Sequence, residues 1–263
     1  SATPPLDSRL VEPEGTDEIV GGRRLRASPS MPEHGDPHAI LDALVVAHVA
    51  PARAPSSDLL TRSDADSDFA TDTSVRTAGT DPATGERYLE ELAFEVVHTQ
   101  SARDVTEKAE RLRARGVRRV FGVFVRRHAV CEWQGGGVWK TLPLDGVIDD
   151  PCLAVPLPVR AILDDLPNVR DVIARALIAQ DMPAIHKLRV EEREAGREEG
   201  TARSILAVLD ARGLSVTDEL RARVLECRDA VQLEQWLRRA AVATNVGDVV
   251  DTPAAPATTK HDG

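Results

Sequence analysis

The chain has 263 residues, enough to bury a sizeable core in one domain and to add a smaller appendage. Its net charge of −10 argues against a protein that binds nucleic acid over most of its surface, but a local basic patch is compatible with this charge. Aromatic residues make up 3% of the chain, so the core is expected to consist of Val, Leu, Ile and Ala.

The cysteine spacing and the hydropathy of the chain indicate where in the cell the protein is expected. Cys131, Cys152 and Cys227 are odd in number and far apart, which fits neither a zinc site nor a disulfide framework and suggests a reducing compartment. No apolar run approaches the length of a membrane span, and the N-terminus has no apolar signal core. We therefore expect a soluble, cytoplasmic protein with no membrane partner.

Both ends of the chain are predicted to be disordered. Residues 1–36 are rich in Pro, Gly, Glu and Ser without apolar periodicity, and residues 244–263 form a tail rich in Ala, Pro and Thr. Met31 is followed by Pro-Glu-His-Gly, which looks like a start site and predicts that residues 1–30 are an extension.

The first periodic segment, residues 37–50, predicts a helix with Asp36 as N-cap and Pro37 at the first helical position. An acidic run follows, in which Asp64, Asp66 and Asp68 alternate like the start of a calcium-binding EF-hand loop. The run lacks the glycine and the glutamate that such a loop requires at its sixth and twelfth positions. A solvated loop is therefore the favoured interpretation.

A hairpin is predicted next. Residues 71–77 form a strand with Asp72 near its start, Pro and Gly in residues 81–85 favour a tight turn, and residues 88–99 form a largely buried strand. Glu95 is a lone carboxylate within the apolar part of that second strand. Antiparallel pairing can bring Asp72 and Glu95 to the same end of the sheet.

The segment after the hairpin predicts a strand–helix–strand unit. Ser101 is a suitable cap for a helix that runs to residue 115, and residues 117–125 form the next strand, so the two strands should be parallel with a right-handed crossover. A second hairpin is expected from residues 129–133 and 138–142. The fold class is therefore α/β, a mixed sheet flanked by helices.

The C-terminal part predicts a small helical bundle, because its amphipathic segments are joined by short connections. The expected helices cover residues 157–163, 168–179, 188–200, 202–212, a segment capped by Thr217, and residues 230–243. The segment 207–225 within this bundle suggests a homo-oligomer or docking of a protein partner.

Five features occur in a fixed order along the chain. An Asp on one predicted strand is followed by a hairpin turn and by Phe-Glu-Val-Val on the next strand; a Ser and then Asp-x-x-x-Lys on a helix come after them. The residues are Thr71-Asp72, Glu95-Val96-Val97, Ser101, Asp104, Lys108 and Gly116-Val117. This order resembles the Uma2 family (DUF820) of the PD-(D/E)XK restriction-endonuclease-like superfamily. The resemblance spans residues 38–165 and implies a nuclease domain at 37–165, with the helical region at 166–243.

The resemblance also implies an active site for Mg²⁺-dependent, or Mn²⁺-dependent, hydrolysis of DNA phosphodiester bonds. Asp72 and Glu95 would hold the metal, with the Val96 carbonyl as a third ligand, because hard oxygen ligands suit Mg²⁺. The superfamily usually has a lysine two residues after the glutamate, where this chain has Val97. Lys108 on the following helix is the expected substitute, and its charge would stabilise the developing oxyanion.

A basic cluster surrounds Lys108 in the sequence. Lys108, Arg111 and Arg115 share one face of the predicted helix and could line a phosphate track for DNA. A solvated helix face explains the same spacing equally well.

Several alternatives remain open from the sequence. Glu95 could point to solvent, and Asp104 and Lys108 could form an ordinary surface ion pair. Val97, the acidic net charge and the long helical tail favour a nuclease-fold protein that has lost activity and serves as an interaction module. A small-molecule binding protein without a metal is a third hypothesis.

Overall fold

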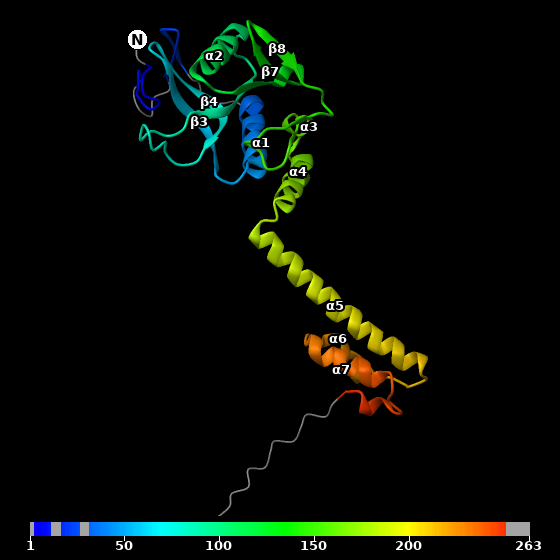
Figure 1. Cartoon of the computed structure of the whole chain (residues 1–263). Helices are drawn as coiled ribbons and strands as arrows, with labels where there is room; N and C mark the ends of the chain where they lie inside the picture. Colours follow the sequence, from blue (N-terminus) through cyan, green and yellow to red (C-terminus); the bar gives the residue numbers. More distant parts are fainter. Residues whose placement is uncertain (1–2, 12–16, 27–31, 251–263) are drawn as a thin grey trace, which may run out of the picture. The chain divides into compact units, whose positions relative to one another are not determined.

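The structure, a computed structural model, describes residues 3–11, 17–26 and 32–250 (Figure 1). The chain divides after Asp181 into two compact parts, here the sheet unit (residues 1–181) and the helical unit (residues 182–263). The predicted boundary lay at residue 165, before α4 (Leu166–Ala179). This helix belongs to the sheet unit because Val169 is part of its core and Gln180 Nε2 donates a hydrogen bond to the Ala47 carbonyl at 2.6 Å.

The sheet unit is built on an eight-stranded sheet of order β2-β1-β4-β5-β6-β7-β8, with β3 also paired to β4. Its strands are β1 (Asp17–Val20), β2 (Arg23–Arg26), β3 (Arg53–Asp64), β4 (Ser67–Thr77), β5 (Glu90–Val97), β6 (Arg119–Phe124), β7 (Ala129–Gly135) and β8 (Val138–Thr141). The β5–β6 pair is parallel and every other neighbouring pair is antiparallel. A small second sheet pairs β9 (Val147–Ile148) with β10 (Leu157–Pro158).

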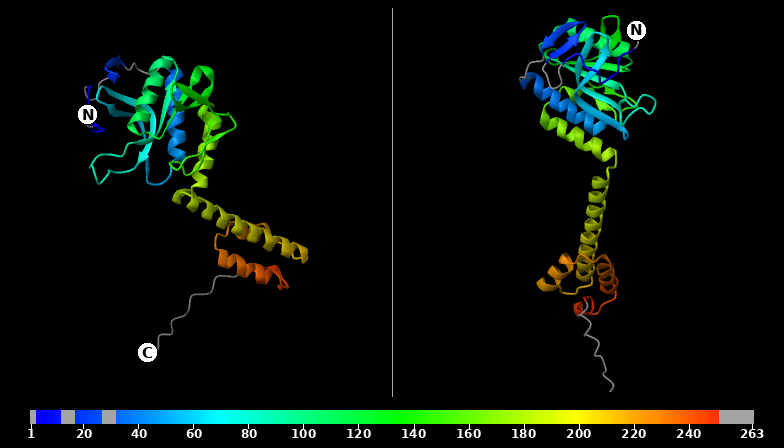
Figure 2. Two further views of the ribbon diagram at one scale, coloured as in Figure 1. Left: turned by 45° about the horizontal axis from the view of Figure 1, so that its top comes forward. Right: turned by 90° about the vertical axis from the view of Figure 1, so that its left-hand side faces the viewer.

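Helices cover both faces of this sheet (Figure 2). Leu92, Phe94 and Val96 of β5 share one core with α1 (Pro32–His48), whereas Ala93 shares another with α2 (Ala102–Arg115). The alternation follows from the period of two along a strand. A short helix, α3 (Val159–Ile162), adds to the α1 core. The predicted mixed α/β class is confirmed.

The predicted β4–β5 hairpin and the β5–α2–β6 crossover are present. The Ser101 side chain caps α2 by accepting a hydrogen bond from the Asp104 N–H, and Gly116 ends the helix with φ of 120°. A side chain is unfavourable in that backbone conformation, which explains the glycine. The second predicted hairpin is also present, as β7 and β8.

Residues 17–26 differ from the disorder expected for residues 1–36. They form the β1–β2 hairpin, which joins the main sheet where Ile19 pairs with Asp68. Gly21 and Gly22 make its turn with φ of 56° and 71°, the conformation that two-residue hairpin turns require. The turn signal was therefore present in the sequence, but the flanking strands are too short and polar to show periodicity. The prediction also fails for residues 3–11, where Leu6 and Val11 are buried, and for residues 32–36, which belong to a helix. Residues 1–2, 12–16 and 27–31, which include Met31, lie outside the described ranges.

Two further boundaries differ from the predicted ones. Helix α1 begins at Pro32, more than a turn before the predicted start, with Pro37 inside it. The acidic run forms the turn between β3 and β4, and Asp68 is fully buried, accepting a hydrogen bond from the Leu10 N–H. The predicted solvated loop is therefore correct only for the tip of this turn.

The helical unit comprises α5 (Pro183–Ala211), α6 (Asp218–Glu226) and α7 (Ala230–Ala240), followed by the short turn η2 (Val246–Asp248). Its core is formed mainly by Ile205, Leu209, Val224, Leu233 and Trp236. The two helices expected from residues 188–212 are one continuous helix. No proline interrupts it near Gly200, and the Thr201 hydroxyl donates a hydrogen bond to the Arg197 carbonyl instead of capping a new helix start.

The last described residues of the helical unit pack into its core. Val249 and Val250 are buried in its core, so the tail predicted to be disordered from residue 244 is partly ordered, and residues 251–263 lie outside the described chain. Across the described ranges, the structure contains no helix with both the length and the apolar character that crossing a membrane requires.

Candidate metal centre

The two predicted metal ligands lie beside each other on β4 and β5. Thr73 pairs with Phe94, and continuing this antiparallel register places Asp72 opposite Glu95. The Val96 N–H donates a hydrogen bond to Asp72 Oδ2 at 2.6 Å, which fixes the Asp72 side chain against β5. Asp72 Oδ1 receives no hydrogen bond from the described residues and is 3.7 Å from His34 Nε2.

Glu95 is buried in an unusual way for a carboxylate. Its side chain is 5% exposed, Oε2 lies 3.8 Å from Lys108 Nζ, and buried Oε1 has no hydrogen-bond partner among the described residues. Burial raises the pKa of Glu95 well above its ordinary value, and the charges of Asp72 and Glu18 raise it further, whereas Lys108 opposes the increase. Burial likewise raises the pKa of Asp72, although the hydrogen bond from the Val96 N–H lowers it in part.

Lys108 reaches these carboxylates from α2. Its side chain is 14% exposed, and Nζ lies 2.9 Å from Glu18 Oε2 while donating to the Ala70 carbonyl at 3.4 Å. Burial alone would lower the pKa of Lys108, but the charges of Glu95 and Glu18 outweigh it and raise the pKa above its ordinary value. The ammonium group is therefore held in its charged form.

Glu18 is a member of this site that the sequence did not reveal. It lies on β1, where Oε1 also accepts a hydrogen bond from the Ala70 N–H at 3.0 Å. The residue falls within the segment predicted to be disordered. The Gly21-Gly22 turn, flanked by Asp-Glu-Ile-Val and Arg-Arg-Leu-Arg, was the signal that could have located the hairpin.

Two histidines of α1 complete the surroundings of Asp72. His38 Nε2 donates to the Asp72 carbonyl at 2.7 Å, and His34 Nε2 faces the Asp72 carboxylate. The predicted helix start at Pro37 left His34 outside the helix, so their shared helical face went unnoticed. An i,i+4 histidine pair was the available signal.

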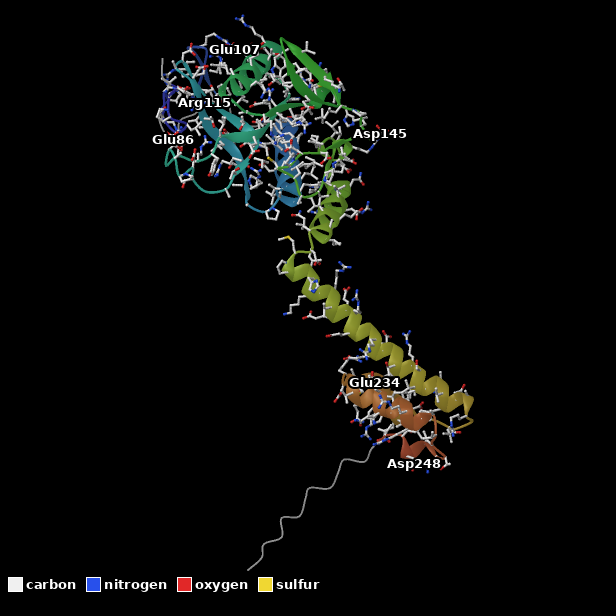
Figure 3. All side chains as sticks on the ribbon, viewed as in Figure 1. Glu86, Glu107, Arg115, Asp145, Glu234 and Asp248 are labelled. Atoms are coloured by element: carbon white, nitrogen blue, oxygen red, sulfur yellow. The ribbon has the colours of Figure 1, made fainter. Side chains whose placement is uncertain are left out.

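The two arginines of the predicted phosphate track bind other residues of this protein. Arg111 Nη1 lies 2.5 Å from Asp64 Oδ2, and Arg111 Nη2 lies 3.1 Å from Glu107 Oε1. Arg115 Nη2 donates to the Pro4 carbonyl at 2.7 Å, and burial lowers the pKa of Arg115. Figure 3 labels Glu107 and Arg115 on the sheet unit. Contact of Lys108, Arg111 and Arg115 with DNA stays a prediction.

Comparison with known proteins identifies a similar solved structure. The chain is similar to a crystal structure described as "a putative nuclease belonging to DUF820" from Anabaena variabilis ATCC 29413, with a TM-score of 0.48 and 15% identity. The match covers 59% of this chain and 93% of that one. DUF820 is also the family that the residue pattern resembles. No family model and no curated protein matches the sequence.

The residues around Glu95 fit a divalent cation. Three carboxyl groups, those of Glu18, Asp72 and Glu95, surround the single ammonium of Lys108, which leaves an excess of negative charge. Burying carboxylates without enough counter-charge is unfavourable unless another positive ion is bound. Glu95 Oε1, which has no hydrogen-bond partner among the described residues, and Asp72 Oδ1, which lies 3.7 Å from His34 Nε2, are hard oxygen ligands of the kind that Mg²⁺ and Mn²⁺ prefer.

Proposed function

We propose that this chain is a metal-dependent endonuclease that hydrolyses DNA phosphodiester bonds, with Mg²⁺ or Mn²⁺ as cofactor. The observation that carries the proposal is the buried Glu95, whose Oε1 has no partner among the described residues and which lies beside Asp72 and Lys108. Structural ion pairs are normally closed by hydrogen bonds, so an open buried carboxylate beside a lysine favours a site that receives a ligand.

Each residue has a role that follows from its surroundings. Asp72 and Glu95 would hold the cation, together with the Val96 carbonyl, which now accepts a hydrogen bond from Gln100 Nε2 at 3.3 Å. When bound, the cation would lower the pKa of a water molecule and neutralise charge on the phosphate. Lys108 keeps its proton because its pKa is raised, so it serves as a fixed positive charge rather than as a base.

Lys108 would compensate for Val97, which stands where the superfamily usually has a lysine. Val97 is buried in a small core with Val105 of α2, so no charged group emerges from β5 at this position. The Lys108 ammonium instead enters from the helix and lies 3.8 Å from Glu95 Oε2. A positive charge is thus available beside the proposed ligands without a lysine on the strand.

The test is cleavage of a supercoiled plasmid with Mg²⁺ or Mn²⁺ by the wild type and by Glu95→Gln. We expect the substitution to reduce the rate by on the order of 100-fold or more, because it removes a ligand charge from the centre. Glu110→Gln, at an exposed position of the same helix as Lys108, is the matched control and should cleave normally.

Two results would overturn parts of the proposal. Cleavage that survives Glu95→Gln would refute the assigned site. Absence of cleavage by the purified wild type across metals and salt concentrations would refute the enzymatic activity and favour the alternative function, an interaction module with a nuclease-like fold.

A further inference from the structure

His34 and His38 form a pair of imidazoles on one face of α1. They are one helical turn apart, with ring centroids 6.0 Å from each other, and their side chains are 18% and 13% exposed. Both rings are therefore shielded from bulk water but accessible to a small ion. Neither ring belongs to the Glu95–Lys108 cluster described above.

Asp72 supplies a third potential ligand to this pair. One ligand atom from each of His34, His38 and Asp72 lies within 4.8 Å of the other two. In a tetrahedral site with metal–ligand distances of about 2.0–2.2 Å, ligand atoms are about 3.3–3.6 Å apart. The 3.7 Å between His34 Nε2 and Asp72 Oδ1 is close to that separation and is longer than a hydrogen bond.

The surroundings of His38 also resemble those of a metal-binding histidine. Its Nε2 lies 3.5 Å from Asp42 Oδ2, and Asp42 is itself fixed by the hydroxyls of Ser57 and Thr73 at 2.6 and 2.5 Å. A carboxylate behind a metal ligand normally binds the histidine nitrogen that is not coordinated, so Asp42 would support His38 in this way only if His38 coordinated the cation through Nδ1. Coordination through Nε2 would require His38 to release its hydrogen bond to the Asp72 carbonyl and to carry the ring proton on Nδ1.

We propose that His34, His38 and Asp72 bind a divalent cation of the borderline class, represented by Zn²⁺, Co²⁺ and Ni²⁺. Two imidazoles and one carboxylate suit these ions, whereas Mg²⁺ prefers oxygen ligands throughout. Three protein ligands leave a coordination position open to water or to a substrate atom. This inference goes beyond the proposed nuclease function, because binding by these three residues requires no cleavage activity.

Asp72 is common to this site and to the proposed Mg²⁺ site. Its Oδ1 faces His34, whereas Oδ2 accepts the Val96 N–H on the β5 side. The two sites are otherwise built from different residues, which makes them separable by substitution. Glu95→Gln removes a ligand of the Mg²⁺ site alone, while His34→Gln and His38→Gln remove ligands of the histidine site alone, and all three leave the shared Asp72 in place.

The test is calorimetric titration of the full chain with Zn²⁺, and absorption spectroscopy with Co²⁺, whose visible bands report tetrahedral coordination. We expect wild type and Glu95→Gln to bind one Zn²⁺ alike, and His34→Gln and His38→Gln to bind it at least about tenfold more weakly. His128→Asn is the control, since His128 is exposed and has φ of 48°, which asparagine tolerates. Circular dichroism checks that each variant is folded.

The outcomes distinguish the two proposals. Absence of Zn²⁺ binding by the wild type, or equal affinity in wild type and both histidine variants, would overturn the histidine site even if Mg²⁺-dependent cleavage is intact. Loss of Zn²⁺ binding in the histidine variants, in a protein that never cleaves DNA, would support the histidine site and refute only the nuclease.

Discussion

The sheet unit contains two clusters of buried charge that differ in their balance. In the paired cluster, Arg118 and Arg119 face Asp150 and Glu132. The Asp150 side chain is 1% exposed and accepts hydrogen bonds from Arg118 at 2.6 Å through both oxygens, from Arg119 at 3.2 Å, and from the Cys152 N–H at 2.9 Å. Arg119 also binds Glu132 at 2.7 Å. Arg118 also lies 3.6 Å from Glu91, which in turn pairs with Arg53, so three guanidinium groups balance three carboxylates.

The acidic cluster, formed by Glu18, Asp72, Glu95 and Lys108, has three carboxyl groups and one ammonium. Glu95 is nearly as buried as Asp150, yet its Oε1 has no partner among the described residues. Burial penalises the charge of both residues, but hydrogen bonds from Arg118 and Arg119 outweigh it at Asp150 and lower its pKa to about 2. At Glu95 burial prevails, and the pKa rises well above its ordinary value.

Burial therefore does not determine the direction of the shift, whereas the supply of counter-charge does. A cluster that is neutral and fully hydrogen-bonded has no need for a further ion and is best understood as structural. A cluster with an open acceptor and excess negative charge stores an unfavourable interaction that a cation would relieve. Removing single charges from the two clusters should reveal this difference.

Lys108→Met should have the largest effect on stability. Removing the one ammonium of the acidic cluster leaves its three carboxyl groups without a positive charge in that cluster, so we expect a loss of about 3 kcal/mol in the free energy of unfolding without divalent metal. Urea denaturation in the presence of a chelator measures this loss. Lys140→Met, at an exposed position of β8, should change stability by less than about 0.5 kcal/mol. Equal effects of the two substitutions would show that Lys108 does not neutralise the cluster.

How far the sequence predicted the fold depended on local signals. The β4–β5 hairpin and the crossover through α2 were predicted because Pro, Gly and the Ser101 cap determine turns and helix ends locally. The β1–β2 hairpin was missed because its four-residue strands are stabilised by pairing with distant β4 rather than by their own periodicity. Tertiary contacts of that kind leave little trace in a local pattern.

The candidate site shows the same division. Asp72, Glu95 and Lys108 were proposed from the order of residues in the resemblance, and the structure places them together. Glu18 and His34 were missed because each enters from an element whose existence or start was misjudged. A residue that joins a site through long-range packing, as Glu18 does through β1, cannot be recognised until that packing is known.

Asp150→Asn should destabilise the protein in a pH-dependent manner. The pKa of Asp150 falls from an ordinary 3.8 to about 2 on folding, so the charged form contributes about 2 kcal/mol to stability near neutral pH. Because the folded pKa is lowered, this contribution is present above the unfolded pKa and is lost as the pH falls through the folded pKa. Urea denaturation at about pH 7 and pH 3 should therefore give a smaller difference between variant and wild type at the lower pH. A difference of equal size at both would contradict the assigned ion pair.

Glu95→Gln should have the smallest effect and the opposite sign. The substitution removes a buried charge that has too little counter-charge, while Lys108 keeps Glu18 as its partner, so we expect the metal-free protein to gain about 1 kcal/mol. Glu132→Gln is the matched control in the paired cluster and should lose stability, because Arg119 loses a charged partner. Urea denaturation with a chelator compares the two variants.

Addition of Mg²⁺ should change the stability of the Glu95→Gln and Glu132→Gln variants by different amounts. A cation bound by Asp72 and Glu95 should stabilise the wild type by about 1.4 kcal/mol when its concentration is about tenfold above the dissociation constant. Glu95→Gln should show little of this gain, and Glu132→Gln should show all of it. If Glu95→Gln instead destabilised the metal-free protein as much as Glu132→Gln does, the carboxylate would be a satisfied structural group. The contrast between the two clusters would then have no functional meaning.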